Sequence, residues 1–181
     1  MVLPFEEEYR KKYYKLLDEV FESNFWSDGI MTRTFEEKFE EYTGLHSCAV
    51  TSGGAGVLSI FEYIGVKGYD VIVPANTFWA TTQSAKMAGA NIIYADCNKE
   101  DLCLSYEDVL KKVTKKTKAI VVVHIGGHIA FDIEKISAFC KEKNNFKCRI
   151  EALHSTIPAK TSPASIVESG KSGSTLRKQP K

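Results

Sequence analysis

The chain has 181 residues, with 24 lysines and arginines against 23 aspartates and glutamates and a net charge of +1. This balance provides no field to attract nucleic acid or an anionic membrane, so neither is expected as a partner. The longest apolar run, residues 119–123, is far shorter than the roughly 20 residues that span a bilayer. The first residues turn acidic at once and lack the regions of a secretory signal, so a cytoplasmic protein is expected.

The near-zero charge conceals two regions of different composition. Residues 147–181 hold seven basic and two acidic residues, six serines, three of the five prolines and no aromatic residue. Residues 1–146 contain every aromatic side chain and carry a net negative charge. We therefore expect a folded region followed by a disordered tail.

The cysteines favour a reducing compartment. There are five, an odd number, and none forms a C-x-x-C pair. Reduced cytosolic thiols are the simplest interpretation, and the scattered histidines do not form the clusters that a zinc site needs. The five are Cys48, Cys97, Cys103, Cys140 and Cys148.

The first fifty residues predict two helices and a strand. Apolar residues at three- and four-residue spacing make residues 5–21 an amphipathic helix, followed by a loop. Thr34 is expected to cap the second helix, with Glu37 completing a capping box and Gly44 ending the helix. Residues 46–50 are predicted to form a short strand.

Further along the chain, predicted strands alternate with helices of about ten residues. This alternation predicts an α/β fold, a three-layer α/β/α arrangement with a mostly parallel sheet. The strands are expected at 70–74, 91–95 and 119–124, with 148–151 as a further candidate, and the helices at 56–64, 79–88, 105–113 and 132–143.

A glycine-rich loop, Thr51-Ser-Gly-Gly-Ala-Gly56, lies between a predicted strand and a predicted helix. Small residues there let backbone N–H groups approach an anion, and the helix N-terminus adds positive potential. A phosphate site is the functional interpretation, and a tight turn without ligand is the alternative. Ser59 at the third glycine position argues against a dinucleotide fingerprint, and no Gly-Lys-Ser/Thr ends the loop as a Walker A motif requires.

An aromatic pair, Phe78 and Trp79, follows the strand at 70–74. Open α/β sheets bind ligands at the carboxyl ends of their strands. Together with the phosphate loop, this placement suggests a planar phosphorylated ligand with an aromatic ring against its face. Packing of the aromatics beneath a loop is the alternative.

The order of these motifs resembles the DegT-type family of pyridoxal 5′-phosphate (PLP) aminotransferases, which mostly aminate keto-sugars attached to nucleotides. The resemblance runs from about residue 3 to residue 146. It is carried by Ser27-Asp-Gly-Ile, Phe35-Glu-Glu-Lys-Phe, Thr51-Ser-Gly-Gly-Ala, Gly68-Tyr-Asp-Val-Ile-Val-Pro, Asn76-Thr-Phe-Trp-Ala-Thr, Gly89-Ala, Tyr94-Ala-Asp, Thr117-Lys-Ala-Ile and Val123-His-Ile-Gly-Gly.

The resemblance implies the incomplete large domain of a fold type I PLP enzyme. Residues 1–33 would form an N-terminal helix and loop, 34–150 a partial PLP-binding domain, and 151–181 a tail outside the family. Asp28 and Gly29 match a loop that lies near the dimer interface and the neighbouring active site in the family.

The resemblance also assigns cofactor-binding residues. Gly53, Gly54 and Ala55 match the backbone cradle of the PLP phosphate, with Gly54 in place of the usual threonine or serine. Phe78 matches the aromatic that stacks on the pyridine ring, whereas Trp79 is expected to pack in the helix. His124 matches a position near the cofactor pocket, for which a buried structural histidine is the alternative.

Two parts of the family's machinery are not found. The carboxylate that pairs with the pyridinium nitrogen is replaced by Ala152, and Glu151 should point to the opposite face of its strand. No residue after 154 has the flanking motifs of the lysine that holds PLP as a Schiff base. The candidates by residue type alone are Lys160, Lys171, Lys178 and Lys181.

Residues after 146 are therefore interpreted as out-of-family sequence, such as a frameshift or readthrough tail. The other two reading frames of the coding DNA test this interpretation. If neither restores the carboxylate and lysine motifs, the frameshift version is wrong.

Three functions are compatible with these observations. The first is a truncated PLP-dependent aminotransferase, inactive alone, whose family transfers an amino group, commonly from glutamate, to a keto-sugar nucleotide. Such a chain is expected to form a homodimer or to associate through exposed sheet edges. The second is a non-catalytic fragment that binds a partner or a phosphorylated ligand. The third is an unrelated small phosphate-binding α/β domain.

Overall fold

The computed structural model describes residues 6–142, 148–153 and 166–167. The chain divides into two compact units, Met1–Ala49 and Val50–Lys181. The tail expected at 151–181 lies outside the described residues, except for 151–153 and 166–167. Among the helices that are described, none is long and apolar enough to cross a membrane.

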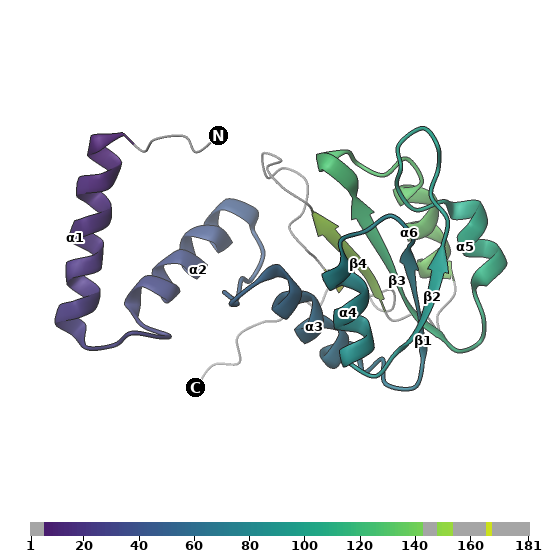
Figure 1. Cartoon of the computed structure of the whole chain (residues 1–181), viewed down its shortest axis with the longest axis horizontal. Coiled ribbons are helices and arrows are strands. Elements are labelled where there is room, and N and C mark those ends of the chain that lie inside the picture. The colour runs from purple at the N-terminus through teal and green to yellow at the C-terminus, as the bar shows by residue number, and fades with distance from the viewer. Residues whose placement is uncertain (1–5, 143–147, 154–165, 168–181) are drawn as a thin grey trace. The chain divides into compact units, whose positions relative to one another are not determined.

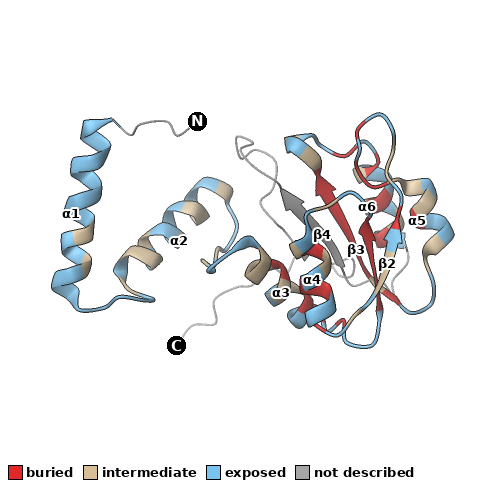
Figure 2. Cartoon of the chain, in the orientation of Figure 1, coloured by how far each residue is buried: buried red, intermediate tan, exposed pale blue. Residues whose placement is uncertain are grey.

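The first unit consists of two helices, α1 (Glu7–Ser23) and α2 (Ile30–Thr43) (Figure 1). The predicted amphipathic helix is confirmed as α1, which ends where Asn24 adopts a left-handed conformation. Neither helix contains a buried residue. Several apolar residues on the face that the periodicity of α1 marks, among them Tyr9 and Tyr13, are exposed, and most of the helix is pale blue in Figure 2.

The predicted start of the second helix is wrong, because α2 begins at Ile30 and Thr34 lies within it. Asp28 has a left-handed φ of 49°, and the extended Gly29 after it caps the helix. The Gly29 carbonyl accepts the first helical hydrogen bond, from the Arg33 N–H at 3.3 Å. The predicted end is confirmed, since Gly44 is the left-handed C-cap.

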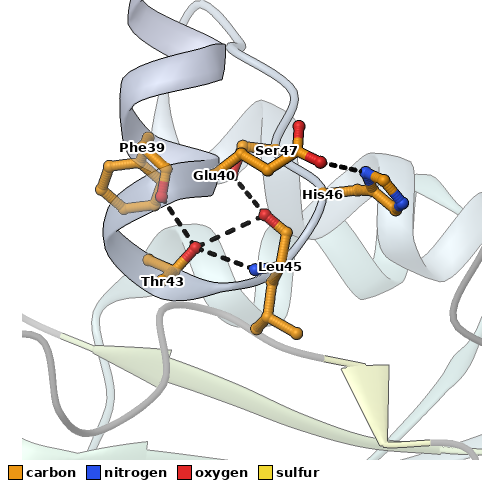
Figure 3. A network of polar contacts seen from close by, with 6 residues as sticks. All are labelled: Phe39, Glu40, Thr43, Leu45, His46 and Ser47. Atoms are coloured by element: carbon orange, nitrogen blue, oxygen red, sulfur yellow. Dashed lines mark hydrogen bonds and ion pairs between the residues drawn. The ribbon is translucent and has the colours of Figure 1, made fainter.

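The predicted strand at 46–50 is also not formed. Figure 3 shows instead a local network at the end of α2, in which the Thr43 hydroxyl donates to the Phe39 carbonyl at 2.8 Å and His46 pairs with Glu40. The Ala49 N–H donates to a Glu36 carboxylate oxygen at 2.7 Å. The Glu36 side chain thus binds a backbone N–H that would pair with a neighbouring strand if residues 46–50 were part of a sheet.

The second unit contains a five-stranded sheet in the order β2-β1-β3-β4-β5, parallel except for the antiparallel β5. The predicted alternation of helices and parallel strands is confirmed. The elements are α3 (Gly53–Ile64), β1 (Asp70–Pro74), α4 (Trp79–Met87), β2 (Asn91–Ala95), α5 (Tyr106–Lys112), β3 (Thr117–His124), a short 3-10 turn η1 (Ile125–Gly127), α6 (Ile133–Glu142), β4 (Cys148–Leu153) and β5 (Ile166–Val167).

Two apolar cores lie on opposite faces of the sheet and establish the three-layer arrangement. Alternate residues of β1 and β3 pack against α3 and α4 on one face, for example Val71 and Val121. The intervening residues, such as Ile72 and Val122, pack against α5 and α6. Burial on both faces explains the continuous apolar runs of these strands, which appear red in Figure 2. The carboxyl ends of the parallel strands meet at one edge.

Candidate functional site

The glycine loop forms the first turn of α3. Ser52 is the N-cap, and its hydroxyl accepts a hydrogen bond from the Ala55 N–H at 3.1 Å while its carbonyl accepts one from the Gly56 N–H, also at 3.1 Å. The first N–H groups of an α-helix have no partner within the helix. The donors of Gly53 and Gly54 therefore face the helix end, where an anion is stabilised.

The surroundings of this turn leave space for an anion. A Cβ added at Gly53 would meet nothing within 4 Å, and one at Gly54 would lie 3.5 Å from the Ala80 Cβ. The Ser84 hydroxyl donates to the Gly54 carbonyl at 3.0 Å and so joins the turn to α4. The first turn of α3 contains no acidic residue that would repel a phosphate.

Phe78 is the N-cap of α4, directly after the loop that leaves β1, and its side chain is 51% exposed. Its carbonyl accepts a hydrogen bond from the Thr81 N–H at 3.0 Å. The exposed ring is accessible to a planar ligand, as the resemblance implies for this position.

The expectation that Trp79 packs in the helix is wrong, because its side chain is 67% exposed. Its ring centroid lies 5.6 Å from that of Phe78, with the planes tilted by 50°. Trp79 is the first residue of α4, and helical Cβ atoms tilt toward the N-terminus. The ring lies beside that of Phe78.

His124 ends β3 and is buried. Its Nδ1 accepts a hydrogen bond from the Ala130 N–H at 3.0 Å, so a neutral ring carries its proton on Nε2. This bond holds the segment that leads from β3 to α6. The geometry matches the structural alternative considered for this histidine, and its role toward a cofactor stays a prediction.

The loop between β2 and α5 contributes groups that sequence reasoning did not select. Burial raises the pKa of the Cys97 thiol. A hydrogen bond from the Asn76 backbone N–H acts in the opposite direction and lowers this pKa, but by less. Asp101 is buried and accepts two backbone hydrogen bonds, described below. A lone Asp in a polar loop gives no periodic signal, so only the fold reveals these contacts.

The sites expected for the other cofactor contacts are only partly described. Ala152 lies beside Val123 in the register of β4 and β3, and Glu151 lies beside Val122. The four candidate lysines after residue 154 lie outside the described residues. Asp28 and Gly29 belong to the first unit.

In the described ranges, no three His, Cys, Asp or Glu side chains form a metal-binding group.

Comparisons with known proteins agree with this fold. The structure of a 3-amino-5-hydroxybenzoic acid (AHBA) synthase matches with a TM-score of 0.74 and 27% identity, over 83% of this chain and 39% of that one. The second unit thus has the architecture of the large domain of fold type I PLP enzymes, in part. The chain belongs to the DegT/DnrJ/EryC1/StrS aminotransferase family, whose model matches residues 7–146.

The curated relatives have names that refer to nucleotide-linked sugars. A GDP-perosamine synthase of Escherichia coli O157:H7 is 35% identical over 66% of this chain and 33% of its own length. A dTDP-4-dehydro-2,3,6-trideoxy-D-glucose 4-aminotransferase of Saccharopolyspora spinosa is 32% identical over 69% of this chain and 33% of its own. The chain spans about a third of the length of these relatives.

The described residues fit one end of PLP, the cofactor that the family implies. The first turn of α3 offers backbone donors, open space at Gly53 and no carboxylate, which suits a phosphate. Phe78 offers an exposed ring for the pyridine face. The register position expected to supply the pyridinium partner holds Ala152. The described residues therefore suit the phosphate of PLP and one face of its pyridine ring, but not the pyridinium nitrogen.

Proposed function

We propose that this chain is the N-terminal part of a PLP-dependent aminotransferase acting on keto-sugar nucleotides, with glutamate as the amino donor. The observation that carries the proposal is the α3 turn, with its Ser52 cap, glycines at the first two helical positions and open space at Gly53. The substrate class is supported by the relatives, whose names refer to a dTDP-linked and a GDP-linked sugar.

The residues of this chain would bind and orient the cofactor. Backbone N–H groups of Gly53 and Gly54 hold its phosphate, the α3 dipole stabilises the negative charge, and Phe78 limits movement of the ring. Bound PLP supplies an electron sink for amino-group transfer. The chain offers no recognisable lysine to attach it, so the 181-residue chain is inactive alone.

Two further features belong to the proposal. A homodimer is supported by exposed apolar side chains on α1 and α2. Sedimentation velocity would test the oligomeric state, and a stable monomer would contradict the homodimer.

A cytoplasmic location is supported by four described cysteines that are free thiols. Secretion with formation of a disulfide would contradict that location.

The alternative of a non-catalytic module that binds a phosphorylated ligand uses the same α3 turn. The two functions differ in whether the pyridine ring of the ligand adds to the binding affinity. Pyridoxine 5′-phosphate has the ring and phosphate of PLP but no aldehyde, so it cannot react with surface lysines. A PLP site binds it more tightly than inorganic phosphate, whereas a simple phosphate module does not.

Gly53→Asp tests the phosphate position. The side chain has room, and a carboxylate in the first helical turn stabilises the helix while it repels a phosphate. We expect the variant to fold and to bind pyridoxine 5′-phosphate at least about tenfold more weakly, measured by calorimetric titration. Gly53→Asn is the neutral control of the same size. Equal affinity of the Asp and Asn variants would contradict the proposal.

A further inference from the structure

The β2–α5 loop, residues 96–105, carries none of the residues assigned to the cofactor. In the chain it comes after the β1–α4 loop that ends at Phe78 and before the β3–α6 loop that begins after His124. Because β1, β2 and β3 are parallel, all three loops leave the same edge of the sheet.

Asp101 fixes the conformation of this loop. Its side chain is buried, and Oδ1 accepts a hydrogen bond from the Cys103 N–H at 3.0 Å, closing a turn across Leu102. Leu102 has a φ of 57°, a left-handed conformation that residues other than glycine rarely adopt. The carboxylate thus holds Leu102 in a conformation that the residue would not choose alone.

Leu102 in turn holds the β1–α4 loop. Its carbonyl accepts a hydrogen bond from the Asn76 side-chain amide at 3.1 Å. Asn76 lies two residues before Phe78, so the left-handed turn sets the segment that carries the exposed ring.

The second oxygen of the same carboxylate reaches the β3–α6 loop. Oδ2 accepts a hydrogen bond from the Phe131 N–H at 2.7 Å. The preceding residue, Ala130, donates its N–H to His124 Nδ1. One buried carboxylate therefore connects the loop of Phe78 with the loop that His124 holds.

We propose that Asp101 is a positioning residue that holds the Phe78 and His124 loops in register at the carboxyl edge of the sheet. Through Asn76, it sets the ring of Phe78 for the cofactor. The effect on cofactor binding rests on the proposed function, whereas the ordering of the two loops does not.

The test compares Asp101→Ala with Asp101→Asn, which keeps one neutral acceptor oxygen, and with Glu100→Ala at the exposed neighbouring position as control. Hydrogen exchange of the Ala130 amide, which Asp101 does not touch, is followed by NMR. Affinities for pyridoxine 5′-phosphate and for inorganic phosphate are measured on the same full-length proteins.

We expect Asp101→Ala to accelerate Ala130 exchange about tenfold and to weaken pyridoxine 5′-phosphate about tenfold, while inorganic phosphate binds as before. Asp101→Asn should give intermediate values, and it carries the test if the alanine variant does not fold. Unchanged Ala130 exchange, or equal weakening of both ligands, would overturn the proposal. If the wild-type chain binds phosphate without preferring the ring compound, the proposed function fails, and Ala130 exchange still decides the role of Asp101.

Discussion

Ser52 shows how a single side chain can define the candidate site. Its hydroxyl satisfies the Ala55 N–H and leaves those of Gly53 and Gly54 at the helix end. The sequence predicted the glycine turn and the phosphate role. It placed the helix start at residue 56, because glycines normally indicate a loop, whereas the cap lets the helix begin at Gly53.

Ser52→Ala should destabilise the second unit by about 1 kcal/mol, because the N-cap bond is lost. Ser59→Ala is the matched control within α3, since the Ser59 hydroxyl only donates back to the Ala55 carbonyl. Its effect should stay within about 0.5 kcal/mol. Urea unfolding followed by circular dichroism measures both, and equal losses would show that the cap does not hold the helix start.

At the scale of elements, periodicity and capping signals located most of the second unit. Strands β1 and β3 are apolar throughout because they are buried on both faces, and this signal is strong in sequence. The errors in the first unit, the start of α2 and the strand at 46–50, arise where Asp28 takes a left-handed conformation and Glu36 binds the backbone of Ala49. Both depend on individual contacts that no periodic pattern records.

Two carboxylates at the ends of α5 and α6 make stability depend on pH. Burial raises the pKa of Asp132, but hydrogen bonds from Lys135, Tyr106 and Asn98 outweigh it and lower the pKa below its usual value. The Lys112 ammonium, followed by the Asp96 N–H, lowers the pKa of Asp108.

Because both pKa values are lower in the folded state, their stabilisation is present above the unfolded value of about 3.9 and is lost as pH falls through the folded values. We expect Asp132→Asn to destabilise the protein at pH 7 and to differ progressively less from wild type as pH falls toward 3. Thermal unfolding across this range measures the difference. Glu107→Gln, on the exposed side of α5, should show a much smaller difference at pH 7. A pH-independent difference for Asp132→Asn would contradict the linkage.

At the scale of the whole molecule, the family match ends at residue 146, where composition and motifs also change. The described part of the second unit provides the α3 turn, which we propose holds a phosphate, and the exposed ring of Phe78 on a partial α/β domain. The lysine and carboxylate that complete the family's site are not recognisable in the sequence. We therefore expect the chain to bind the phosphate of the cofactor without attaching the cofactor covalently.

Visible circular dichroism after addition of PLP to the full 181-residue chain shows whether the chain attaches the cofactor. We expect no band at about 420 nm, the signature of PLP held on a lysine in an asymmetric site. Weak saturable binding of pyridoxine 5′-phosphate to the same sample should nevertheless persist. A band at that wavelength that borohydride abolishes would show that the chain carries its own attachment lysine and would contradict the account.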